Sequence, residues 1–174
     1  MPKRIIEDFT GVKKEVECIG CTITEAGKDV SGYIIETDLF HAHQDYENPI
    51  SGFVVLSTKR HIKSFDEFTD EEAAEFIVLV RKIRKVQREV LGIETVYFIQ
   101  EEDTIGSHFH LWFLPRYDWM NDEARFGKKL NSARPVLQYS KTHMKTPENI
   151  AKVKEAAEKL RSYFDDLPSI DGRR

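Results

Sequence analysis

Polar and apolar side chains alternate strictly along residues 107–115, which read SHFHLWFLP. Strict alternation is the period of a β-strand with one buried face, so this stretch predicts a strand. His108 and His110 then share the face opposite the core, about 6.6 Å apart along the strand. Imidazole acts as a base, nucleophile or metal ligand near neutral pH, so this face is the first candidate for chemistry. The residues expected to face the core are Phe109, Leu111 and Phe113.

Other apolar runs bounded by turn residues predict further strands. Thr37 and Asp38 separate the first two runs, and Ser51-Gly52 precedes the third. The expected strands cover residues 32–36, 39–43, 53–57 and 94–100.

The clearest helix begins after Thr69, which forms a capping box with Glu72. Apolar residues then recur at helical spacing until Leu91-Gly92 ends the run. A second helix is expected over residues 146–164, and a short one around residues 11–17. Hairpin strands with a long inserted helix and a C-terminal helix predict an antiparallel α+β domain.

Bulk composition narrows the class of protein. The chain has 174 residues, is 40% hydrophobic and carries a net charge of −4, which fits one globular domain and argues against binding extended nucleic acid. The first residues have no apolar segment typical of a signal peptide, and no apolar run is long enough to cross a bilayer. We therefore expect a cytoplasmic protein with no membrane partner.

The two cysteines suggest a metal site. Cys18 and Cys21 have the C-x-x-C spacing of a metal half-site or a redox pair, although two ordinary buried thiols are the alternative. Zinc commonly takes two thiolates and two imidazoles in a tetrahedron. His61 and His108 both flank predicted strands, so folding can bring them to the cysteines.

A second H-x-H sequence, His41-Ala42-His43, offers an alternative metal site. With Glu47 and Gly52 it resembles the first metal motif of the cupin barrels. Those folds are nearly all β, and a long capped helix between the strands does not suit them. His41 and His43 then read as ordinary residues of a strand.

Four separated signals resemble the histidine triad (HIT) superfamily of nucleotide hydrolases and transferases. They are C-x-x-C from Cys18, an acidic residue before the G-x-V-V-L strand, KRHI ending at Ile62, and HFHLWFLPR ending at Arg116. The resemblance implies about five antiparallel strands with the long helix packed on them, usually in a homodimer. It divides the chain into an N-terminal extension (1–16), a catalytic core (17–118), a C-terminal extension with a helix (119–165) and a tail (166–174).

The same resemblance implies roles for individual residues. His110 is the nucleophile that attacks an α-phosphate. Ser107 lies beside it and donates a hydrogen bond to the phosphate oxygens. A neutral imidazole whose Nδ1–H is held by a backbone carbonyl presents Nε2 for this attack. Asp45 accepts ribose hydroxyls, and Gln100 begins the phosphate loop. The alternatives are that Asp45 caps a turn and that Gln100 simply ends a strand.

The remaining implied contacts concern the base and the metal. Ile19 and Tyr46 fall where the base is sandwiched. In the zinc-containing branches of the superfamily, the positions that match Cys18, Cys21, His61 and His108 hold the ion. With four protein ligands the zinc is structural.

Trp112 departs from the superfamily pattern because it stands where the third histidine is expected. Indole donates one N–H but cannot deliver a proton at neutral pH. We expect Trp112 to be a nucleotide contact in a hydrolase or nucleotidyltransferase that acts on a small nucleotide. The substrate would be a dinucleoside polyphosphate such as diadenosine tetraphosphate, or a nucleoside phosphoramidate. The alternative is a nucleotide-binding module with weak or no turnover.

Overall fold

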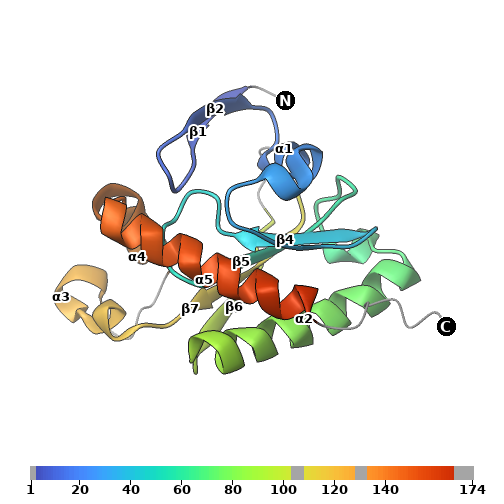
Figure 1. The fold of residues 1–174 in the computed structure, drawn as a ribbon. Coiled ribbons are helices and arrows are strands. Elements are labelled where there is room, and N and C mark those ends of the chain that lie inside the picture. Colours follow the sequence, from blue (N-terminus) through green and yellow to red (C-terminus); the bar gives the residue numbers. More distant parts are fainter. Residues whose placement is uncertain (1–2, 103–107, 128–132, 167–174) are drawn as a thin grey trace.

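A computed structural model describes residues 3–102, 108–127 and 133–166. Its centre is a five-stranded antiparallel sheet with strand order β3-β4-β5-β7-β6, and a separate two-stranded hairpin pairs β1 with β2 (Figure 1). The strands are β1 (Arg4–Glu7), β2 (Lys13–Val16), β3 (Tyr33–Glu36), β4 (Phe40–Gln44), β5 (Val54–Thr58), β6 (Val96–Ile99) and β7 (His110–Pro115).

Helices surround this sheet on both faces and at one end (Figure 1). The α-helices are α1 (Ile19–Ala26), α2 (Asp70–Leu91), α3 (Glu123–Phe126), α4 (Arg134–His143) and α5 (Pro147–Asp165). Short 3-10 turns are η1 (Gly27–Asp29), η2 (Phe65–Glu67) and η3 (Asp118–Asn121).

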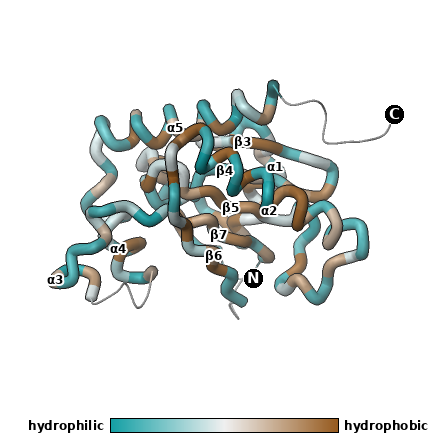
Figure 2. Tube along the Cα trace, turned by 90° about the horizontal axis from the view of Figure 1, so that it is seen from below, coloured by the Kyte–Doolittle hydropathy of each residue, from teal (hydrophilic) through white to brown (hydrophobic). Residues whose placement is uncertain are grey.

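Alternation along the three central strands separates two chemically different faces of the sheet. One face is apolar and packs against α2 and α5 as the main core. Figure 2 shows the hydrophobic positions concentrated on the strands in the middle of the molecule. The strand residues of this face include Phe40, Ala42, Val54, Leu56, Leu111 and Phe113, and the helix residues include Leu79, Ile83, Val86, Leu160 and Phe164.

The opposite face carries most of the polar strand residues. The register pairs Ser57 with His110 and His41, and pairs Val55 with Trp112 and His43. Helix α1 and the β1–β2 hairpin lie over this face (Figure 1). The polar face is therefore the one available for a site.

The long helix forms as its sequence predicts. Thr69 accepts a hydrogen bond from the Glu72 amide, and the Glu72 carboxylate accepts one from the Thr69 amide. Gly92 ends the helix in the left-handed region at φ 65°, where glycine is not strained. Buried Gln87 then ties the helix to the sheet by donating to the Gly52 carbonyl at 2.8 Å.

The short helix expected around residues 11–17 is wrong, because residues Lys13–Val16 form strand β2. Asp8 directs this outcome: its carboxylate accepts hydrogen bonds from the amides of Thr10 and Val12, which closes a tight turn. The turn brings the following residues back beside β1, where antiparallel pairing satisfies the backbone.

Residues 117–146 contain η3, α3 and α4, none of which the sequence pattern predicts. Their apolar residues gather in a second core cluster at the end of the sheet. Trp119 packs on Phe126 and Tyr139 in this cluster. The buried members are Ile50, Phe53, Leu114, Met120, Phe126 and Val136.

The predicted α+β class, the five-stranded antiparallel sheet and the C-terminal helix are thus confirmed. The cupin alternative is wrong, because the sheet is open and helices cover its faces. Within the described ranges, no helix has the length and apolar character needed to cross a membrane.

Candidate active site and metal site

His110 opens strand β7 on the polar face of the sheet. Its Nδ1 lies 2.8 Å from the carbonyl oxygen of His108, a distance at which Nδ1–H donates to that oxygen. This contact selects the tautomer whose Nε2 carries a lone pair. Ser57, its partner across the sheet, donates to the Phe109 carbonyl at 2.7 Å and so holds the start of β7 in place.

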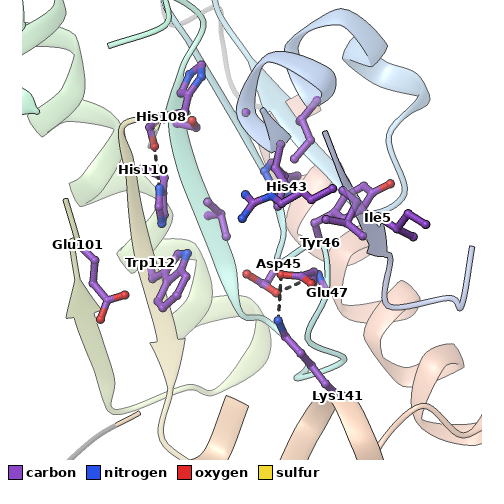
Figure 3. A pocket seen from close by; sticks show the side chains of 17 residues that line it. Ile5, His43, Asp45, Tyr46, Glu47, Glu101, His108, His110, Trp112 and Lys141 are labelled. Atoms are coloured by element: carbon purple, nitrogen blue, oxygen red, sulfur yellow. Dashed lines mark hydrogen bonds and ion pairs between the residues drawn. The ribbon is translucent and has the colours of Figure 1, made fainter. Parts of the chain in front are cut away.

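The His110 ring lines a cavity of about 490 Å³, a volume in the range of small-molecule sites. Figure 3 shows His110 and Trp112 on one side of this cavity and Tyr46 and Asp45 on the other. The sequence-predicted residues that line the cavity are Ile19, Asp45, Tyr46, His108, His110 and Trp112.

Asp45 lies at the cavity and also caps a turn. Its Oδ1 accepts hydrogen bonds from the amides of Glu47 and Asn48 and from the Asn48 side chain at 2.7–3.1 Å. Its Oδ2 has no hydrogen-bond partner among the described residues. Burial raises the pKa of this carboxyl, and the hydrogen bonds from Asn48 oppose that shift. Asp45 therefore caps the turn with Oδ1, as the alternative interpretation predicts, and its Oδ2 is available to a ligand.

Of the two predicted phosphate contacts, the structure describes only Gln100. Gln100 is absent from the residues that line the cavity, although its neighbour Glu101 lines it. The Gln100 Nε2 group is buried and has no hydrogen-bond partner within the described ranges. Ser107 lies outside the described residues.

Trp112 stands directly beside the candidate nucleophile. Its ring centroid lies 5.3 Å from that of His110, at an interplanar angle of 46°. Phe53 packs edge-on against the indole, with ring centroids 5.8 Å apart. Trp112 is thus held in place by packing, and it gives the cavity an aromatic wall next to His110.

Several cavity residues were missed by sequence reasoning. Strand β1 contributes Arg4, Ile5 and Ile6, and α4 contributes Lys141. These residues come from segments outside the recognised motifs, and no local signal marks them. His43 was seen only as a strand residue, yet it also lines the cavity.

The four predicted metal ligands come together above the same face. Their donor atoms all lie within 4.8 Å of one another. The four sulfur–Nδ1 separations run from 3.1 to 3.6 Å. Zinc bonded to sulfur at ~2.3 Å and nitrogen at ~2.0–2.1 Å in a tetrahedron requires a separation of about 3.6 Å. The residues are Cys18, Cys21, His61 and His108, and their geometry fits a tetrahedral metal ion.

Neighbouring groups orient this cluster. His108 Nε2 lies 2.7 Å from the Thr58 carbonyl oxygen, so its proton is on Nε2 and Nδ1 faces the cysteines. Gly20 packs against the same imidazole, where a Cβ would lie 2.4 Å from a ring carbon. The C-x-x-C turn therefore needs glycine at this position to approach His108.

The two thiols are electrostatically unequal. Burial raises the pKa of Cys18, but hydrogen bonds from His108 and the Cys21 amide outweigh it and lower that pKa to about 6. Burial and the neighbouring Cys18 raise the pKa of Cys21 to about 11. Cys18 is therefore the thiol prepared to act as a thiolate, the form that binds metals.

His41 and His43 stack on each other on β4, with ring centroids 5.5 Å apart. His43 Nδ1 donates to the Gln44 carbonyl at 2.6 Å. Neither nitrogen of buried His41 has a hydrogen-bond partner in the described part of the chain. Burial lowers the pKa of His41 to about 2 and that of His43 to about 4.

We expect His41→Leu to stabilise the protein by about 1–2 kcal/mol at pH 7.5, because it removes a buried polar group without partners. The unfolded chain protonates His41 near pH 6.5 and the folded chain only near pH 2, so native stability falls as the pH drops below 6.5. In the variant, the free energy of unfolding should no longer include the decrease that His41 causes below pH 6.5, which is about 1.4 kcal/mol per pH unit. Urea unfolding at pH 7.5 and 5.5 measures both effects, and parallel pH dependences of the two proteins would contradict the prediction.

Fold and site together define a class: proteins whose open antiparallel sheet carries a histidine into a ligand-sized cavity beside a Cys/His cluster. No family model matches the chain. The Hit protein of Bacillus subtilis is 32% identical over 104 residues, which cover 58% of this chain and 71% of that protein. The chain belongs to the histidine triad (HIT) family, as its motifs predict.

Solved structures have the same fold. A zinc-bound histidine triad protein from Mycobacterium smegmatis matches with a TM-score of 0.56 at 17% identity, over 85% of this chain and 95% of that one. The diadenosine triphosphate hydrolase of Plasmodium falciparum, solved with cyclomarin A, matches with a TM-score of 0.55 at 16% identity, over 97% and 90% of the two chains.

Proposed function

We propose that this protein cleaves nucleotides at the α-phosphate through a covalent nucleotidyl intermediate on His110. The observation that carries the proposal is the 2.8 Å contact of His110 Nδ1 with the His108 carbonyl, in a ring that lines the cavity. It leaves Nε2 unprotonated beside space for a phosphate. An imidazole held in this way is a nucleophile at neutral pH.

The reaction would proceed in two displacements. The Nε2 lone pair attacks the α-phosphorus and forms an N–P bond, while the bond to the leaving oxygen or nitrogen breaks and its electron pair departs with the leaving group. Nδ1–H keeps its hydrogen bond to the His108 carbonyl, and this hydrogen bond stabilises the positive charge that develops on the ring. Water or another acceptor then attacks the same phosphorus and loses a proton. The N–P bond breaks, and its electron pair returns to Nε2.

Binding roles follow from the walls of the cavity. The free Oδ2 of Asp45 suits a ribose hydroxyl, because a carboxylate oxygen accepts hydrogen bonds. Ile19 and Tyr46 offer apolar and aromatic surface to a base, and Trp112 flanks the reacting phosphate. Ser107 and Gln100 remain proposed phosphate contacts. A dinucleoside polyphosphate such as diadenosine tetraphosphate is the proposed substrate, with a nucleoside phosphoramidate as the second choice.

We also propose that the Cys/His cluster holds zinc. The donor separations of 3.1–3.6 Å and the oriented Nδ1 of His108 support this assignment. Four protein donors leave no position for water, so the ion would be structural. It would fix the segment that leads into β7, since His108 is two residues before His110.

A homodimer is part of the proposal, as is a cytoplasmic location. Strand β6 is the outermost strand at one edge of the sheet, and its Phe98 is 51% exposed. An uncovered edge strand with an exposed aromatic residue is suited to pairing with a second copy.

Trapping the intermediate tests the proposed reaction. Protein mixed with diadenosine tetraphosphate labelled at the α-phosphate is quenched in alkaline denaturant, because a phosphorus–nitrogen bond to histidine survives alkali better than acid. We expect label on the wild-type chain and none on His110→Asn. Turnover without a labelled chain in the wild type would contradict the covalent route.

A nucleotide-binding module with weak turnover is the second candidate. It is favoured by Trp112, which packs at the position beside His110 and has no proton to deliver at neutral pH. Tight nucleotide binding with neither label nor product, across polyphosphate and phosphoramidate substrates, would support this candidate over the enzyme.

A further inference from the structure

The β1–β2 hairpin lies over the cavity and is firmly attached at its turn (Figure 1). Phe9, in that turn, is fully buried, and its amide donates to the Tyr46 carbonyl at 2.6 Å. Lys145 of the connection between α4 and α5 donates to the Glu7 carboxylate at 2.8 Å and to the Asp8 carbonyl at 2.7 Å. The hairpin is therefore a fixed wall of the site.

Arg4, at the start of β1, is an exposed residue that lines the cavity. Side chains of successive strand residues point to opposite faces, so Arg4 shares a face with Ile6, which is 5% exposed. Ile5, on the other face, is 74% exposed and also lines the cavity. Arg4 itself lines the cavity, as His110 does.

Arg4 is also the cation of the cavity wall that has no counter-ion among the described residues. The second cation of the wall, Lys141, pairs with Glu47 at 2.9 Å. The third carboxylate that lines the cavity besides Asp45 and Glu47 is Glu101, which pairs with Arg134 at 3.7 Å. Arg4 makes no ion pair or side-chain hydrogen bond with any described residue. A guanidinium that lines the cavity and has no anion among the described residues is available to an anionic ligand.

We propose that Arg4 binds a phosphate group of the nucleotide in this cavity, so that the N-terminal hairpin belongs to the catalytic site. The inference rests on the proposed function, since it takes the ligand to be a nucleotide. The planar guanidinium offers paired N–H donors that match two phosphate oxygens. Arg4 would hold the phosphates over His110 from the side opposite the sheet.

Binding measurements on adenosine, AMP and ADP isolate this contact, because they need no turnover. We expect Arg4→Ala to weaken AMP and ADP binding by about tenfold or more and to leave adenosine within about twofold. Arg4→Lys should restore part of the loss through its point charge. Lys3→Ala is the matched control: it removes the same charge from the residue next to Arg4, but Lys3 pairs with Glu15 and does not line the cavity.

Three results would overturn the inference while the proposed function stands. The first is unchanged AMP affinity in Arg4→Ala. The second is an equal loss for adenosine and AMP, which would assign Arg4 a packing role only. The third is an equal loss of AMP affinity in Arg4→Ala and Lys3→Ala, which would reflect net charge alone. If the wild-type protein binds none of the three compounds, the proposed function and this inference both fail.

Discussion

Replacing His110 with asparagine should lower the turnover of diadenosine tetraphosphate by at least about 10³-fold and change nucleotide affinity by no more than about threefold. The asparagine amide can still donate to the His108 carbonyl, as His110 Nδ1 does now. It has no basic nitrogen lone pair, so the nucleophile is lost while the local hydrogen bond is kept. Steady-state kinetics together with direct nucleotide binding measure the two quantities separately.

The matched control for this experiment is His143→Asn. His143 is exposed at the end of α4 and does not line the cavity, so the same chemical exchange there should leave turnover unchanged. If His110→Asn keeps more than about a tenth of wild-type turnover, the nucleophile assignment is wrong. If both variants lose activity equally, the loss comes from instability.

Removing one of the proposed metal ligands should destabilise the protein more than an ordinary exposed substitution does. His61 is exposed, so His61→Ala gives up little packing and reports mainly the loss of the ion. We expect the free energy of unfolding to fall by about 3–5 kcal/mol and Tm by about 10 °C, since the ion binds the folded chain only. Thermal unfolding with and without a strong chelator, alongside zinc analysis of the purified protein, gives the measurement.

His143→Ala serves as the control, because it removes another exposed imidazole that no metal cluster uses. Chelator should lower the Tm of the wild type and of His143→Ala, and it should leave His61→Ala nearly unchanged. A wild-type Tm that does not respond to chelator, with no zinc in the protein, would remove the metal proposal.

Much of the fold was predictable because local chemistry and tertiary packing agree there. The capping box at Thr69 and the glycine at position 92 bound α2 as expected. The alternation around His110 correctly predicts that Phe109, Leu111 and Phe113 are buried and that His110 and Trp112 line the cavity, whereas His108 lines the cavity and is also buried. Residues 13–16 were mispredicted because their pairing partner lies across a turn that Asp8 closes, and helical spacing does not reveal such pairing.

The residues of the candidate site also separate into those that the sequence identifies and those that only the structure reveals. Motif residues such as Cys18, His61 and His108 were identifiable from their types and order, and the structure brings their donor atoms together. Arg4 and Lys141 were not, because their positions at the cavity depend on where a hairpin and a later helix pack. His41 has no hydrogen-bond partner among the described residues, which likewise depends on the segments that pack around it and not on its neighbours in sequence.

By itself the sequence determined the strand and helix periods, the helix caps, the residue types available for chemistry and the resemblance to the HIT family. Only the tertiary structure decided which side chains share the cavity, which cation there has no counter-ion among the described residues, and which backbone carbonyl accepts from His110 Nδ1. Periodicity and capping act between residues close in the chain, whereas a cavity and its charges arise from contacts between segments that are far apart in it.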